Sequence, residues 1–120
     1  MKTVIFNGTA WPLRYSLRAA INIGDRYGSV KNALFDEGAD QGEQLRRRIA
    51  VFLEMLKAGK AWAEREDGVS MPELPAEEEL LDGMTFKKAA ELIETMLEVV
   101  NEDDRSDFAA EGDAKNAEAR

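Results

Sequence analysis

The stretch Trp11–Gly28, WPLRYSLRAAINIGDRYG, holds the start, the cap, the body and the end of one predicted helix. Pro12 favours an extended backbone at Trp11, so a short strand that ends at Tyr15 is predicted just before the helix. Ser16 then offers a hydroxyl oxygen to the N–H groups of the first helical turn. Gly28 stands where a left-handed residue ends a helix. Apolar residues at helical spacing make one face of this helix apolar, namely Leu17, Ala20, Ile21, Gly24 and Tyr27.

The residues before this helix predict a β-hairpin. The run Thr3-Val4-Ile5-Phe6 favours strand, Asn7-Gly8 is a strong turn signal, and Trp11–Tyr15 is the second predicted strand. Two strands alone are marginal in water, so they must pack on helices or pair with another chain. Pro12 has no N–H to donate, which indicates an edge position.

The rest of the chain predicts a mainly α fold, a small bundle of about four helices. We expect a short helix over 29–37, a long one over 42–66, one or two helical turns over 76–82, and a last helix over 85–101 that Thr85 caps. Residues 102–120 contain one aromatic and no branched aliphatic residue, which predicts a flexible acidic tail. The predicted organisation is a single domain over 1–101, followed by the tail.

Two of these helices carry more apolar surface than one buried face needs. On the long helix, the main stripe is predicted core and contains Leu45, Ile49, Phe52, Leu53, Leu56 and Ala63. A second apolar edge, which contains Val51, Met55 and Trp62, either covers the hairpin of its own chain or contacts another subunit. The apolar arc of the last helix spans roughly half of its circumference, which is more than a surface helix of a lone domain usually shows. This helix is therefore either central in the bundle or shared with a partner. The candidate interaction residues are Val51, Met55, Trp62, Phe86, Ile93, Met96, Leu97 and Val100.

Charge is distributed unevenly along a chain whose net charge is −8. Residues 1–35 carry five basic and one acidic side chain, whereas 64–101 carry three basic and eleven acidic ones. This balance argues against general nucleic-acid binding and permits head-to-tail association, although an acidic surface that only maintains solubility remains the alternative. Arg46, Arg47 and Arg48 point around three sides of their helix, and either bind local acids such as Glu43 or dock an acidic partner. The candidate charged contacts are Arg14, Arg18, Arg26, Arg46, Arg47 and Arg48.

The amino-acid composition lacks the residues on which most catalytic sites depend. The chain contains no cysteine and no histidine, so it lacks thiolates, the commonest general base and the commonest transition-metal ligand. The consecutive acids Glu77–Glu79 do not converge on one point of a helix, and no calcium-loop pattern surrounds them. We therefore expect no enzyme activity, no catalytic residue, no metal and no cofactor. No apolar run approaches the length of a membrane span, so no membrane partner is expected.

Two stretches resemble the phage tail assembly chaperones. WPLRYSLRAAINIGDRYG at 11–28 resembles their N-terminal signature, in which a strand carrying Leu-Arg leads into a helix that ends in an aromatic residue and Gly. LLDGMTFKKAAELI at 80–93 is similar to their final element, a Thr-capped helix with a small-Glu-Leu-Ile sequence, matched here by Ala90-Glu91-Leu92-Ile93.

The resemblance implies a non-enzymatic role in building a long phage tail, in the host cytoplasm. Such chaperones coat the tape measure protein, self-associate as rings or spirals, and are displaced as tail tube protein polymerises. The alternative is another small phage interaction protein, either a head–tail connector or an acidic inhibitor that mimics DNA. A DNA mimic requires its carboxylates along one surface, whereas Glu77–Glu79 and the acids of 91–98 lie on separate predicted elements.

Overall fold

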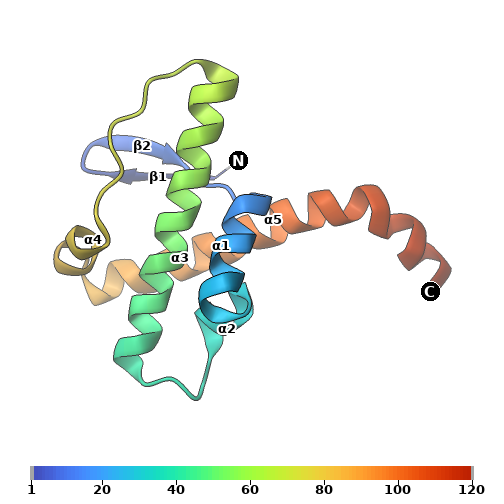
Figure 1. Cartoon of the computed structure of the whole chain (residues 1–120), viewed down its shortest axis with the longest axis horizontal. Coiled ribbons are helices and arrows are strands. Elements are labelled where there is room, and N and C mark those ends of the chain that lie inside the picture. The colour runs from blue at the N-terminus through green and yellow to red at the C-terminus, as the bar shows by residue number, and fades with distance from the viewer. Residues whose placement is uncertain (1, 120) are drawn as a thin grey trace.

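The computed structural model describes the backbone of residues 2–119 and the side chains of residues 2–103. Within these residues a two-stranded hairpin is followed by helices α1 to α5 (Figure 1), which confirms the mainly α fold with an N-terminal hairpin. The flexible tail predicted for 102–120 lies, apart from Glu102 and Asp103, outside the residues whose side chains are described.

The hairpin pairs β1 (Thr3–Phe6) with β2 (Thr9–Pro12) in antiparallel register. Asn7 and Gly8 both have positive φ, 50° and 77°, as a two-residue turn of this hand requires. Such a turn pairs the residues that flank it directly, so β2 begins at Thr9, earlier than the predicted 11–15 strand. The N–H of Leu13 still bonds to the Lys2 carbonyl at 2.9 Å, which extends the pairing beyond β2.

Helix α1 (Leu17–Tyr27) begins and ends where the sequence predicts, and α2 (Val30–Phe35) begins as predicted but ends two residues before Glu37. The Ser16 hydroxyl accepts a bond from the Ala19 N–H at 3.1 Å, and Gly28 ends α1 with a φ of 89°. The buried side of α1 is not the apolar face that the sequence predicts, because Ala19 and Ile23 are buried while Leu17 is 77% exposed. Leu17 and Ile21 of that face are exposed, because α1 packs on α3 through the other side of the helix.

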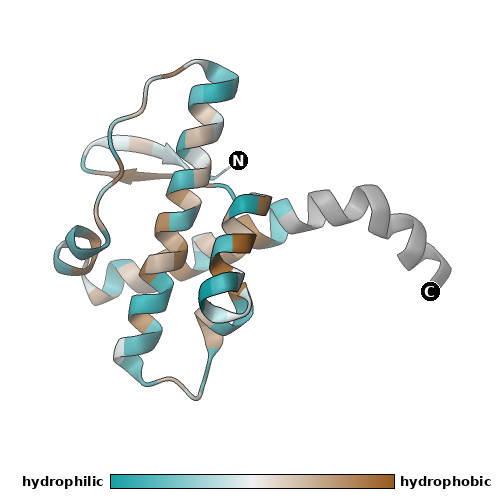
Figure 2. Ribbon diagram, viewed as in Figure 1, coloured by the Kyte–Doolittle hydropathy of each residue, from teal (hydrophilic) through white to brown (hydrophobic). Residues whose placement is uncertain are grey.

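Helix α3 (Gln41–Trp62) is the centre of the molecule and contacts α1, α2, α4, α5 and β2. It continues as a π-helical turn (Ala63–Asp67) that Gly68 ends with a φ of 65°. Because neighbours surround α3, four consecutive side chains, Ile49–Phe52, are all buried. Hydrophobic residues recur along α3, which contacts both α1 and α5 (Figure 2). A helix in this position buries two faces, so the second apolar edge of α3 is largely core.

The last two helices meet at a sharp elbow, Met84-Thr85, between α4 (Glu77–Gly83) and α5 (Phe86–Ala119). The Thr85 hydroxyl accepts a bond from the Lys88 N–H at 3.1 Å, which confirms the predicted cap. Leu80 anchors α4 in the core, and α5 crosses behind α3 in the view of Figure 1. The buried row of α5 consists of Leu92, Met96, Val99 and Val100.

Candidate protein-binding surfaces

The first candidate surface is an apolar hollow of about 190 Å³ at the α4–α5 elbow, which we call the elbow groove. Leu45 and Ile49 of α3 line it, together with Leu81 of α4. From the elbow and α5, Met84 and Phe86 also line it. Phe86 is 63% exposed, so this ring lies at the rim, where a partner can cover it. A rim of this kind is what an apolar docking surface requires.

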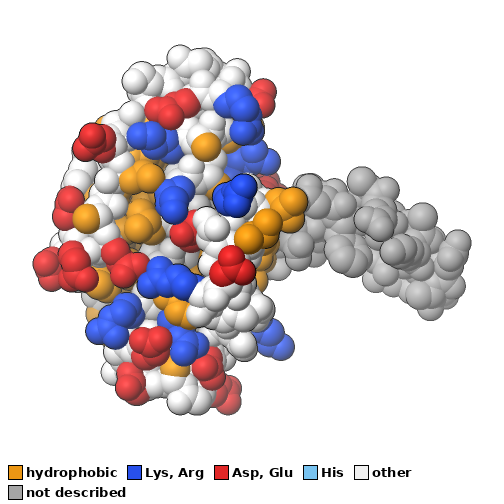
Figure 3. All heavy atoms as spheres, in the orientation of Figure 1, with side chains coloured by type: hydrophobic (Ala, Val, Ile, Leu, Met, Phe, Trp, Pro, Cys, Tyr) orange, Lys and Arg blue, Asp and Glu red, His pale blue; other side chains and the backbone are white. Residues whose placement is uncertain are grey.

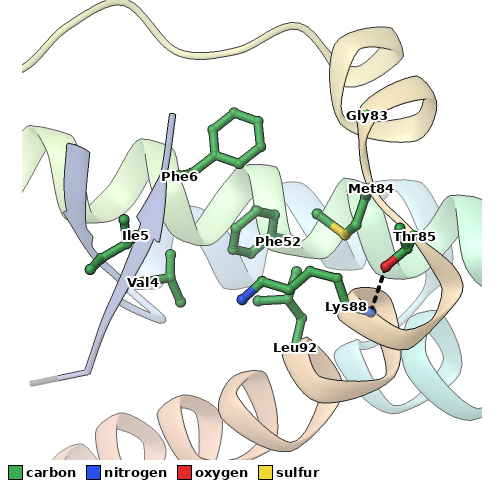
Figure 4. Close-up of a pocket in the computed structure, with 9 residues that line it drawn as sticks. All are labelled: Val4, Ile5, Phe6, Phe52, Gly83, Met84, Thr85, Lys88 and Leu92. Carbon is green, nitrogen blue, oxygen red and sulfur yellow. Dashed lines mark hydrogen bonds between the residues drawn. The ribbon is translucent and has the colours of Figure 1, made fainter. Parts of the chain in front are cut away.

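A second hollow of about 280 Å³, the strand hollow, lies between β1, α3 and the same elbow (Figure 4). In the close-up, Val4 and Phe6 of β1 and Phe52 of α3 point into it, and the Lys88 side chain extends across its mouth. Met84 and Thr85 line both hollows. The two hollows therefore form one apolar surface that wraps around the elbow.

The structure divides the candidate interaction residues predicted from the sequence. Phe86 lines the elbow groove and is exposed, and Ile93 and Leu97 continue its stripe on α5 as half-buried side chains. Four others are withdrawn as contact residues because their side chains are buried in the chain's own core: Val51, Met55, Met96 and Val100.

Trp62 is half-buried and lies apart from both hollows. The Arg14 guanidinium carbon lies 5.8 Å from the centroid of the Trp62 ring, in the range of a cation–π contact. Arg14 also donates its backbone N–H to the Met55 carbonyl at 3.3 Å, which ties the end of the hairpin to α3. The exposed part of Trp62 is thus bordered by a cation of its own chain.

Among the described residues, five large exposed apolar side chains were not among the predicted contacts: Ile5, Leu17, Ile21, Phe35 and Val69. Strand alternation is the signal for Ile5, because Val4 and Phe6 pack against the core and the side chain between them points to the other face of the strand. Leu17 and Ile21 are four residues apart, so they form one exposed apolar pair on α1.

The three consecutive arginines of α3 bind their own chain, as the local alternative predicted. Arg47 bonds to Glu43 at 2.9 Å and to Asp36 at 3.0 Å, and lies 5.3 Å from the centroid of the Tyr27 ring. The hydrogen bond to Glu43 is the main cause that raises the pKa of Arg47 above its usual value. Arg48 donates to the Leu34 carbonyl at 3.2 Å, so both side chains fasten α2 to α3.

Arg46 is the most exposed of the three arginines, and its bond to Glu43 measures 3.4 Å. Arg26 is also engaged within the chain, since it pairs with Glu77 of α4 at 3.5 Å and stacks on the Tyr27 ring. The two remaining predicted charged contacts, Arg14 and Arg18, line the same hollow.

This hollow of about 340 Å³ lies between α1 and α3, and we call it the basic groove. Lysine and arginine side chains gather over the start of α1 and the adjoining half of α3 in Figure 3. One acid lies among them, Glu54, which accepts a bond from the Asn22 amide at 3.0 Å and pairs with Lys57 at 3.4 Å. The basic residues that line the groove are Arg14, Arg18, Lys57 and Arg65.

Within the described residues, no group of three or more acidic side chains is placed to hold a metal ion. The helices of this part of the chain also include none that is long and apolar enough to cross a membrane. Comparison of the chain with models of known protein families, with curated proteins and with solved structures finds no match.

Proposed function

We propose that this chain is a non-enzymatic phage tail assembly chaperone that self-associates and binds apolar helical segments of the tape measure protein in the host cytoplasm. The observation that carries the proposal is where the resemblance falls in the fold. The stretch 80–93, similar to the final element of these chaperones, supplies most of the elbow groove. Its contributions are Leu80, Leu81, Met84, Thr85, Phe86 and Ala89.

The chemistry of the groove suits an amphipathic helix. Such a helix places apolar side chains at i, i+3, i+4 and i+7, and a hollow lined by Leu45, Ile49 and Leu81 accepts them one after another. Covering an exposed phenylalanine contributes roughly 1.5–3 kcal/mol for full burial, so Phe86 is the strongest single anchor on offer. The flexible thioether of Met84 adapts to partner side chains of different shape.

A charged side chain at the mouth of the strand hollow favours a partner that carries acidic as well as apolar side chains. Lys88 lies across the strand hollow and its ammonium is 4.0 Å from Glu91, a loose pair that a partner's carboxylate can replace. Ile93 and Leu97 lengthen the apolar stripe beyond Phe86, so a helix of several turns can lie along α5. A long helical tape measure protein offers many such segments.

The direct test is a fluorescence anisotropy titration with labelled helical peptides from the tape measure protein of the same phage. Phe86→Glu is expected to weaken binding at least about tenfold, because it places a charge in the apolar contact. Lys87→Glu is the matched control, since Lys87 is an exposed neighbour that lines neither hollow and should bind like the native chain, apart from long-range charge effects. Equal affinity of the native protein and Phe86→Glu would contradict the proposed site.

A further inference from the structure

Two oppositely charged surfaces of this fold carry side chains that form no ion pair with any other described side chain. In the basic groove, Arg14 stacks on Trp62 and Arg18 extends into solvent. Among the described side chains, neither arginine has a carboxylate within ion-pair distance, whereas Lys57 and Arg65 in the same groove are paired with Glu54 and Glu66. The groove therefore presents two cations whose charge the fold leaves uncompensated.

The complementary surface is the acidic edge, which we define as Glu73, Glu78, Glu79 and Asp82. Figure 3 shows acidic side chains along the margin that α4 occupies in Figure 1. Glu77 pairs with Arg26, but the acidic edge itself has no cationic partner within the described part of the chain. Glu73 and Glu79 also line an open recess of about 260 Å³ beside Asn7 and Thr9.

We infer that the basic groove of one copy binds the acidic edge of a second copy. The inference rests on the self-association included in the proposed function, and it names the surfaces that meet. The two surfaces are different, so the contact is heterologous, and its repetition generates a ring or an open spiral according to the rotation between copies.

The groove is built for close approach by a protein surface. Ala58 and Ala61 line it alongside the cations, so small side chains allow a partner's backbone to come near. The stacking of Arg14 on Trp62 holds the guanidinium in place before binding, which reduces the entropy lost on association. A carboxylate-rich surface fits better than nucleic acid, because the whole chain carries a net charge of −8 and repels phosphates.

Sedimentation velocity of the full chain across concentration, at low salt and at about 1 M NaCl, tests the inference. Association is expected to weaken at high salt, where the Debye length falls to about 3 Å. Arg18→Glu should raise the dissociation constant at least about tenfold, because it sets like charges against each other. Lys31→Glu makes the same charge change at an exposed residue of α2 outside the groove and should associate much more like the native protein.

A mixing experiment distinguishes a heterologous contact from a symmetric one. The double variant Glu78→Arg with Asp82→Arg should also associate more weakly by itself, whereas a symmetric groove-to-groove contact would leave it unaffected. Mixed with Arg18→Glu it should associate again, because the native groove of one variant then meets the native edge of the other.

Unchanged association of Arg18→Glu, with association of the native chain intact, would overturn the inference and leave the proposed function standing. A native chain that stays monomeric at every concentration would overturn both the inference and the self-association. Binding of the tape measure protein, the other part of the proposed function, is then tested independently by the titration with tape measure peptides.

Discussion

Gly59 of α3 packs directly against Pro12 of β2, and a Cβ atom at Gly59 would overlap the carbonyl oxygen of Pro12. This contact brings the hairpin against the central helix, beside the hydrogen bond from the Arg14 N–H to the Met55 carbonyl. The two-stranded hairpin, marginal by itself, is stabilised because it lies on α3. The position of β1, and with it one wall of the strand hollow, depends on this close approach.

Gly59→Ala is therefore expected to destabilise the protein by about 1–3 kcal/mol or more, because the overlapping neighbour is backbone and must shift. Gly24→Ala on α1 is the matched control. No atom lies within 4 Å of a Cβ placed there, so alanine should be neutral or stabilise the helix by about 0.5–1 kcal/mol. Urea unfolding followed by circular dichroism measures both. Equal stability of the two variants would show that the close contact between Gly59 and Pro12 does not hold the hairpin against α3.

Met55→Ala tests whether the second apolar edge of α3 is core. Met55 is fully buried, so the truncation should cost about 2–5 kcal/mol. Leu17→Ala removes a comparable side chain that is largely exposed, and should change the free energy of unfolding by less than about 0.5 kcal/mol. Thermal unfolding of the two variants should place their midpoints clearly apart. A small effect at Met55 together with a large one at Leu17 would reverse the packing described for α1 and α3.

Arg47→Ala should destabilise the junction of α2 and α3 by about 1–3 kcal/mol, because Arg47 joins Asp36, Glu43 and the Tyr27 ring. Arg46→Ala, one residue earlier, removes an exposed pair with Glu43 and should cost between zero and about 1 kcal/mol. Hydrogen exchange of the α2 amides provides a local measurement, with faster exchange expected in Arg47→Ala alone. Equal exchange in both variants would argue against the fastening role of Arg47.

Stability should decline at alkaline pH through two groups. Burial raises the pKa of Tyr27 above 10.0, and the hydrogen bond to Glu98 raises the pKa of Lys2 above 10.5. In both cases the folded chain retains a proton that the unfolded chain releases, so the free energy of unfolding falls as pH rises past about 10. The double variant Tyr27→Phe with Lys2→Met should show a shallower decline in urea unfolding. An unchanged slope would exclude these groups as its source.

Local chemistry made much of this fold predictable. The Asn7-Gly8 turn, the caps Ser16, Ser29 and Thr85, and the break at Gly28 act through neighbouring backbone atoms, so the sequence indicates them directly. These local features indicate where the helices start, whatever the tertiary packing of the helices is.

The buried faces were harder to predict because neighbours select them. Helix α1 is apolar on more than one side, and its packing on α3 selects Ala19 and Ile23 over Leu17 and Ile21. Val51 and Met55 are buried because five elements surround α3, which periodicity within one helix does not reveal. The elbow groove likewise joins residues of three helices. Its sequence signal is limited to the apolar residues around Gly83.

The proposed chaperone function is tested most directly by the solubility of a tape measure protein encoded in the same genome, co-expressed with and without this chain and followed by light scattering. The native chain is expected to keep the tape measure protein in solution as a complex, and Phe86→Glu should do so less well than Lys87→Glu. A tape measure protein that aggregates equally in the presence and absence of the native chain would rule out the chaperone function.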